Sequence, residues 1–174
     1  MKKLIALLML VCIALMPAAL AETTITWDEI GGAAVEANGL EGDFYALDDM
    51  GLLIWLPNSL NAMEISEEDA AAGRYALYMD QETGAYVAID AVHVDDMTLD
   101  QALENATANG MTEPEIVNIN GIDAVTYADP ANNMGSIVLV DTNSNMIIFS
   151  FSPIDSDEAK LAYGIIGSSI MGAE

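Results

Sequence analysis

Short runs of apolar residues, separated by turn-forming residues, recur along most of the chain. Runs of this length that are bounded by Gly, Pro, Asn or Asp are typical of β-strands. The segment Gln81–Gly84 has hairpin chemistry, and Asn120-Gly121 favours a type I′ turn. The pattern predicts strands at residues 44–47, 52–56, 74–80, 85–94, 115–119, 122–128, 136–140 and 146–151.

Three further segments have the capping residues of α-helices. Thr26 with Glu29, and Thr98 with Gln101, have the spacing of a capping box, and Asp155 is placed to cap a final helix. We therefore expect helices at residues 27–38, 99–109 and 156–171, and one or two helical turns between residues 66 and 73.

The order of these elements predicts an α+β fold class. Strands that are joined by tight turns pair antiparallel, so we expect a single, mostly antiparallel sheet. The continuous apolar run Leu52–Leu56 indicates a strand that is buried on both faces. We therefore expect helices on both faces of the sheet. One cover is the helix from residue 156, and the other has an apolar stripe formed by Leu99, Ala102, Leu103 and Ala106.

The beginning of the chain has the three parts of an export signal. Lys2 and Lys3 precede the apolar run Leu4–Met16, and Ala19–Ala21 is a small-x-small cleavage pattern. The apolar run is shorter than the ~20 residues that a membrane span needs. We expect cleavage after Ala21, and a secreted or extracytoplasmic mature chain without a transmembrane segment. The expected division is a signal peptide at 1–21, an N-terminal helical segment at 22–41 and a single α+β domain at 42–174.

Removal of the signal would leave a strongly acidic chain. All 28 Asp and Glu residues follow Ala21, whereas Arg74 and Lys160 are the only Lys or Arg residues there, which gives a formal charge of −26. Nucleic acids and anionic lipids are bound through Lys and Arg, so this charge excludes nucleic acid as a partner and favours a basic peptide or protein. The only cysteine, Cys12, lies in the signal, so the mature chain would have no disulfide and no cysteine nucleophile.

Four segments together resemble a known family. They are the strand Gly51–Pro57, the helix start Leu99–Leu103, the hairpin Ile119–Val125 and the phenylalanine-rich strand Ile147–Pro153. In this arrangement the chain resembles the PsbP-like family of small exported bacterial proteins, from about Phe44 to the end. The resemblance implies an α/β/α sandwich and a binding or adaptor role, and it implies no conserved chemistry. The first predicted helix has no counterpart in that family.

The sequence contains one histidine, His93, as a candidate catalytic residue. His93 lies at the end of a predicted strand, with Asp90, Asp95 and Asp96 nearby, so a His–Asp pair is one interpretation. A surface histidine at a strand end is the interpretation that we favour. The sequence has no Gly-x-Ser-x-Gly nucleophile motif. We therefore assign no catalytic and no cofactor-binding residue.

Clustered oxygen-bearing side chains raise the question of calcium. Ca²⁺ prefers carboxylate and amide oxygens, and two predicted loops supply them. No segment matches the Asp-x-Asp-x-Asp-Gly loop with a glutamate at its twelfth position, so we expect no bound cofactor and keep only candidate ligands. The candidate metal ligands are Asp129, Asn133, Asp141, Asn143 and Asn145.

The aromatic residues have two interpretations, a ligand groove or the core. Aromatic residues within strands are usually core residues, so we expect Trp27, Trp55 and most tyrosines to be buried. Strand alternation places Tyr75 and Tyr78 on opposite faces. We expect the eight methionines after Ala21 to fill gaps in the core.

Two functions from different classes fit this chain. The first is an exported, non-enzymatic acidic domain that binds a protein or basic peptide. The alternative is an exported hydrolase that uses carboxylates, with or without Ca²⁺, and its support is the number of carboxylates and His93. A pocket that contains His93 or two facing carboxylates would favour the hydrolase, and an open acidic surface would favour binding. The pattern predicts no oligomeric state.

Overall fold

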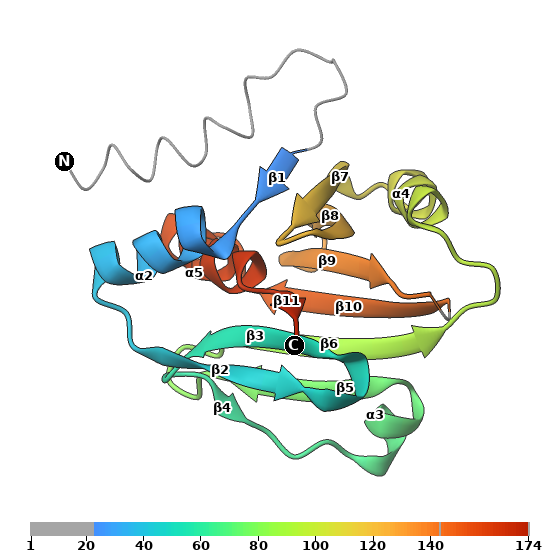
Figure 1. Cartoon of the computed structure of the whole chain (residues 1–174). Coiled ribbons are helices and arrows are strands. Elements are labelled where there is room, and N and C mark those ends of the chain that lie inside the picture. Colours follow the sequence, from blue (N-terminus) through green and yellow to red (C-terminus); the bar gives the residue numbers. More distant parts are fainter. Residues whose placement is uncertain (1–22, 143, 174) are drawn as a thin grey trace.

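The computed structural model describes residues 23–142 and 144–173, and the predicted export signal lies outside them. The chain has an α+β fold with a large, mostly antiparallel sheet and a few helices (Figure 1). The strands are β1 (Thr23–Ile25), β2 (Gly42–Leu47), β3 (Leu52–Pro57), β4 (Asn61–Ala62), β5 (Arg74–Met79), β6 (Tyr86–His93), β7 (Thr112–Ile119), β8 (Ile122–Asp129), β9 (Met134–Val140), β10 (Asn145–Ser152) and β11 (Met171–Gly172). The helical elements are η1 (Trp27–Gly31), α2 (Gly32–Asn38), η2 (Asp48–Met50), α3 (Glu67–Ala71), α4 (Leu99–Ala108) and α5 (Asp157–Ser168).

The strands form two sheets, so the expectation of a single sheet is wrong. The large sheet has the order β1-β7-β8-β9-β10-β6-β5-β4, and the small sheet has the order β11-β3-β2. Strands joined by tight turns pair antiparallel as predicted, for example β5 with β6 and β7 with β8. The strand β3 is buried as its apolar run indicates, but it pairs with β2 and with β11, which follows the last helix. A pairing between such distant segments leaves no local pattern in the sequence.

The N-terminal segment begins with a strand that the sequence pattern does not predict. Residues Thr23–Ile25 pair in parallel with Val117–Ile119, and the backbone N–H of Asn120 donates to the carbonyl of Ile25 at 2.8 Å. Three residues are too few to show the period of a strand. The helix that follows starts as a π-helical turn at Trp27, and its α-helical part covers Gly32–Asn38.

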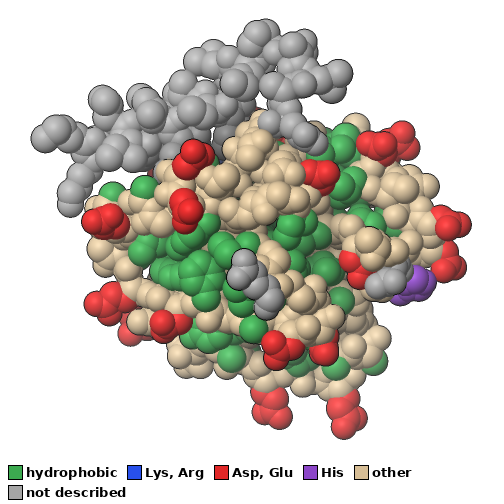
Figure 2. Space-filling view, viewed as in Figure 1, with side chains coloured by type: hydrophobic (Ala, Val, Ile, Leu, Met, Phe, Trp, Pro, Cys, Tyr) green, Lys and Arg blue, Asp and Glu red, His purple; other side chains and the backbone are tan. Residues whose placement is uncertain are grey.

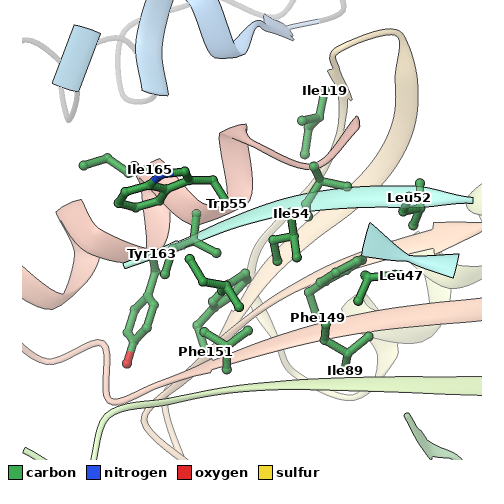
Figure 3. Packing of buried hydrophobic residues seen from close by; sticks show 14 of the residues in the cluster. Leu47, Leu52, Ile54, Trp55, Ile89, Ile119, Phe149, Phe151, Tyr163 and Ile165 are labelled. Carbon is green, nitrogen blue, oxygen red and sulfur yellow. The ribbon is translucent and has the colours of Figure 1, made fainter. Parts of the chain in front are cut away.

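The main core lies between one face of the large sheet, the small sheet and α5. Ile54 and Leu47 of the small sheet pack with Phe149 and Ile89 of the large sheet (Figure 3). In the middle of α5, the ring centroid of Tyr163 lies 5.3 Å from that of Phe151 on β10. These residues are buried because successive strand residues alternate between faces, which brings one apolar row from each strand to this side. We call this side the main face.

The opposite face of the large sheet packs against α4, and we call it the α4 face. Ala102 of α4 forms a buried cluster with Val125 and Val138, and half-buried residues such as Leu99 and Ile148 surround it. On β10, Ile147 therefore points to the main face and Ile148 to the α4 face. The apolar stripe that predicts the second helix is thus the side of α4 that contacts the sheet.

The helix caps agree with the sequence pattern in one case and differ in two. Thr98 and Gln101 form a complete capping box, as predicted. The Thr26 hydroxyl instead donates to the Glu29 carboxylate at 3.0 Å and caps no backbone group. The last helix is capped by Ser156, which accepts from the N–H of Ala159 at 3.1 Å, and not by Asp155. Both differences lie at the start of a helix, where neighbouring polar side chains compete for the capping position.

The type I′ turn at Asn120-Gly121 is confirmed. Asn120 has φ 48° and Gly121 has φ 87°, and a type I′ turn requires positive φ at both positions. The Asn120 side chain also holds neighbouring elements together. Its Oδ1 accepts from the N–H of Trp27 at 2.7 Å, and its Nδ2 donates to the carbonyls of Ser168 and Ile170, each at 2.8 Å. This turn therefore connects η1, the β7–β8 hairpin and the end of α5.

Candidate functional site

The calcium candidates lie in two turns at opposite ends of β9. Asp129 ends β8 and Asn133 precedes β9, whereas Asp141 follows β9 and Asn145 begins β10. A strand rises about 3.3 Å per residue, so β9 separates the two turns by about 20 Å. Asn143 lies outside the described residues. The structure therefore does not bring the candidates into one site.

The Asp129 carboxylate is used within its own turn. Its Oδ1 accepts from the N–H groups of Ala131 and Asn132 at 3.0 and 3.2 Å, and its Oδ2 accepts from Asn132 Nδ2 at 2.6 Å. The hydrogen bond from the Asn132 side chain is the main cause that lowers the pKa of Asp129, because hydrogen bonds favour the ionised form. Asn133 Oδ1 accepts from the N–H of Ile154 at 3.0 Å. These side chains stabilise the turn and its contact with the start of the last helix.

The second turn lies next to His93, the last residue of β6. Asp141 accepts from the N–H and the Nδ2 of Asn145 at 2.9 and 2.8 Å, and Asn145 Oδ1 lies 3.3 Å from His93 Nδ1. His93 Nε2 lies 3.2 Å from Asp95 Oδ1. Within residues 23–142 and 144–173, no three His, Cys, Asp or Glu side chains are grouped so that they could hold a metal ion.

The His–Asp pair that the sequence suggests thus forms with Asp95, at the surface. The His93 side chain is 59% exposed and the Asp95 side chain is 96% exposed, so the pair is largely hydrated. Asp90, which is also near in sequence, pairs with Arg74 on the neighbouring strand β5. A pair in water gains little mutual stabilisation, which agrees with the interpretation of His93 as a surface residue.

The most unusual surface of the described chain surrounds β2. Leu40, Phe44 and Tyr45 are the exposed large hydrophobic residues among those described, and Phe44 is 43% and Tyr45 39% exposed. The Phe44 ring contacts Trp27 edge to face at 5.2 Å between centroids, and Tyr45 contacts Tyr78 at 6.0 Å. Phe44 and Tyr45 are consecutive, so they place one aromatic ring on each face of the small sheet. We call these exposed residues and the outer edge of β2 the β2 surface.

A β-bulge corrects the expected placement of two tyrosines. The register between β5 and β6 shifts between Arg74 and Ala76, so Tyr75 is an extra residue in β5. Tyr75 and Tyr78 therefore both pack on the main face instead of on opposite faces. Burial is the first cause that raises the pKa of Tyr78, followed by the neighbouring Tyr45 and Tyr75 hydroxyls. The bulge thus gathers three tyrosines beside β2.

The outer edge of β2 is open for pairing. Among the described strands, β2 pairs only with β3. The N–H of Asn58 donates to the carbonyl of Glu41 at 2.9 Å, so this pair is a hydrogen-bonded pair of the ladder. Such pairs alternate in antiparallel strands, so the backbone N–H and C=O groups of Gly42, Phe44 and Ala46 point away from β3. The edge can therefore accept another strand.

Acidic residues flank this edge. Glu41, Asp43, Asp48 and Asp49 are exposed, and residues 41–49 contain no Lys or Arg. Figure 2 shows hydrophobic side chains gathered over the part of the molecule near α2 and the small sheet, with Asp and Glu around its periphery. The β2 surface therefore combines aromatic rings, free backbone groups and negative charge.

Sequence reasoning missed this surface because Phe44 and Tyr45 look like core residues of a strand. The signal that could have found them is the local composition. Residues 41–49 carry four acidic residues, whereas the buried strand Leu52–Leu56 carries none. The more general expectation that aromatic residues are buried is confirmed for Trp55 and Tyr163. It is not confirmed for most tyrosines, because Tyr45 is exposed and the others, like Trp27, are half-buried: Tyr75, Tyr78, Tyr86 and Tyr127.

Among the described residues, no helix combines the length and apolar character that crossing a membrane requires. No known family model matches the sequence, and no curated protein matches it either. Among solved structures, the chain is similar to the Ran-binding protein Mog1p of Saccharomyces cerevisiae. The two are 12% identical, and the match covers 78% of this chain and 97% of Mog1p with a TM-score of 0.45. A likeness of this degree carries no argument about function.

Proposed function

We propose that the protein is an exported, non-enzymatic binding domain that takes up an extended basic segment of a partner protein at the β2 surface. The observation that carries the proposal is the open edge of β2, which has an aromatic ring on each face and acidic residues on both sides. An extended segment that adds to a sheet edge gains affinity from backbone hydrogen bonds and specificity from alternate side chains.

The chemistry of the edge supports this mode of binding. The outward groups of Gly42, Phe44 and Ala46 would pair with an incoming strand, whose side chains would alternate between the Phe44 side and the Tyr45 side. Aromatic faces attract cationic side chains as well as apolar ones. A segment in which Lys or Arg alternates with apolar residues therefore fits both faces.

Charge supports a basic partner over a second copy of the same chain. Pairing of two β2 edges would bring together Glu41, Asp43, Asp48 and Asp49 of both copies, and like charges across a strand pair are destabilising. A basic segment turns the same residues into favourable contacts and is attracted by the charge of the whole domain.

A defined peptide tests the proposal. The mature chain is titrated with a short peptide of alternating Lys and Val, and with a twin that has Glu in place of Lys. We expect the Lys peptide to bind, more weakly at high salt, and the Glu twin not to bind. Equal binding of the twins would contradict a charge-selective site.

Two substitutions at one position test the role of the edge. Ala46→Pro removes an N–H that points away from β3, so the fold should tolerate it while the edge loses a donor. We expect the Lys peptide to bind at least about tenfold more weakly to this variant. Ala46→Val keeps the N–H and serves as the control. Equal affinities of the two variants would show that the peptide does not add to the β2 edge.

Export is part of the proposal and rests on the sequence of residues 1–21. A positive start, an apolar run and the Ala19–Ala21 pattern support cleavage after Ala21. The intact mass of the protein recovered outside the native cells should correspond to a chain that begins at Glu22. Recovery of the full-length chain inside the cells would contradict this part of the proposal.

We also propose the PsbP-like α/β/α sandwich as the family-level description of the fold. Its support is that α4 and α5 belong to clusters on opposite faces of the large sheet. An experimental structure with both helices on the same face would contradict it. Neither hydrolysis nor calcium enters the proposal, because His93 lies in solvent and the Asp129 carboxylate is used within its turn.

A further inference from the structure

A cleft of about 180 Å³ lies beside α4, on a different part of the molecule from the β2 surface. Its walls include three methionines, Met97, Met111 and Met146, together with Tyr127. Asn105 of α4 and Asn109, the residue that follows α4, are exposed and also line the cleft. Met97 and Met146 pack against the cluster of Ala102, Val125 and Val138, in partial agreement with the expectation that methionines fill gaps in the core. All three methionines are half-buried and line the opening.

The cleft exists because α4 presents small residues toward the sheet. Ala102 and Ala106 are buried at helical spacing, and they face Val138 and Ile148 of the large sheet. Leucine at these positions would fill the space as it does in ordinary amphipathic helices. The two alanines thus leave a gap that is bounded by apolar side chains on both sides.

The lining suits an uncharged molecule. None of the ten residues that line the cleft carries a formal charge at neutral pH. Methionine side chains adapt to irregular ligands and contact aromatic rings favourably. The acidic surface of the domain repels anions before they reach the cleft. The volume resembles that of an engineered cavity of roughly 150 Å³ that binds benzene, so it admits a small molecule and excludes a peptide segment.

We infer that this cleft binds a small, neutral aromatic molecule that carries one hydrogen-bonding group. The aromatic ring would lie between the alanine side of α4 and Ile148, with the methionines around it. The polar group would be served by the amides of Asn105 and Asn109 or by the hydroxyl of Tyr127. The site is independent of the proposed partner binding at the β2 surface.

Methionine methyl groups report directly on the cleft. The mature chain with ¹³C-labelled methionine methyls is titrated with indole, which is flat and neutral and has one N–H donor. We expect saturable shifts at Met97, Met111 and Met146, with Met50 and Met63 unchanged as internal controls. Benzoate, which is anionic, should cause no shift. Absence of saturable shifts with indole, or larger shifts at Met50 and Met63, would overturn the inference.

A filling substitution tests the place of binding. Ala106→Leu would occupy the cleft, and we expect indole affinity to fall at least about tenfold with the melting temperature kept or raised. Ala108→Leu makes the same change at an exposed position of α4 and should leave indole binding unaltered. If Ala106→Leu fails to fold, Asn105→Leu at the exposed rim provides a second test of the entrance. Unchanged indole affinity in the folded filling variant would overturn the inference.

Discussion

The two faces of the large sheet are packed to different degrees. Among the described residues, the hydrophobic cluster of the main face, with the small sheet and α5, has twenty buried members, whereas the cluster of the α4 face has three, which are Ala102, Val125 and Val138. The α4 face has a cleft beside its helix. A close-packed core stabilises a fold but has no room for a ligand, so binding functions need a less filled region. The contrast indicates that stability resides on the main face and small-molecule recognition on the α4 face.

The two covering helices are also held differently. The last turn of α5 is tied to Asn120 through the carbonyls of Ser168 and Ile170, and Gly167 lets the helix approach Ile137 so closely that a Cβ would lie 2.6 Å from its Cδ1. The helix α4 starts at the Thr98 capping box and packs through alanines. We therefore expect α5 to open only with global unfolding and α4 to open locally.

The largest expected effect comes from emptying the main face. Phe149→Ala removes a fully buried ring and should lower the free energy of unfolding by about 3–5 kcal/mol. Ile148→Ala changes the neighbouring residue, which borders the cleft on the α4 face, and should cost roughly 1–2 kcal/mol because the site is already partly open. Urea unfolding measures both. Equal costs would remove the distinction between the two faces.

Loss of the Asn120 side chain should have the next largest effect. Asn120→Gly keeps the positive φ without strain but removes three hydrogen bonds, so we expect a loss of about 2–3 kcal/mol in urea unfolding. Asn120→Asp keeps an acceptor for the Trp27 N–H. It replaces the side-chain NH₂ group, which donates to the carbonyls of Ser168 and Ile170, with an oxygen that can only repel them. That variant should be no more stable than Asn120→Gly at neutral pH. Stability equal to that of the unchanged protein would contradict the role of the two donors.

Removal of the α4 cap should have a smaller and local effect. Thr98→Ala should cost about 1 kcal/mol and should increase amide hydrogen exchange in α4 more than in α5. Thr26→Ala is the matched control, because Thr26 caps no backbone group, and its cost should stay within about 0.5 kcal/mol. Uniform exchange in both helices would mean that α4 is not a separate opening unit.

Local features of the fold were predictable from the sequence, and long-range pairing was not. The strand at residues 122–128 and the Asn120-Gly121 turn before it were both predicted from residues that are adjacent in the chain. The small sheet depends on pairing of Met171 with Leu53, which are far apart in the chain. Hydrophobic periodicity depends only on residues that are close in the sequence, so it does not predict which strands pair with each other.

The candidate sites were less predictable than the strands. The exposure of Phe44 depends on β2 being the outer strand of a separate sheet, and the position of Tyr75 depends on a bulge that no residue type announces. The cleft follows from Ala102 and Ala106, which the sequence indicates only as members of an amphipathic stripe. Each of these sites forms where separate helices and strands pack together, and the sequence pattern of a single helix or strand does not predict that packing.

A tyrosine of α5 gives the main face a dependence on alkaline pH. Burial is the first cause that raises the pKa of Tyr163 from 10.0 to about 12, and its hydroxyl donates to the carbonyl of Ser152 at 2.5 Å. The folded state therefore holds this proton more tightly than the unfolded state does. The resulting stability is complete below pH 10 and is lost as the pH rises toward 12.

Tyr163→Phe is the smallest of the expected changes and separates this hydroxyl from the packing of its ring. The ring contact with Phe151 remains, so we expect a loss of only about 0.5–1.5 kcal/mol at neutral pH, from the missing hydrogen bond. Between pH 10 and 12 the variant should lose stability less steeply than the unchanged protein in urea unfolding. Some decline should persist, because burial also raises the pKa of Tyr78 on the same face. An unchanged slope would show that the alkaline transition does not begin at the contact between α5 and the large sheet.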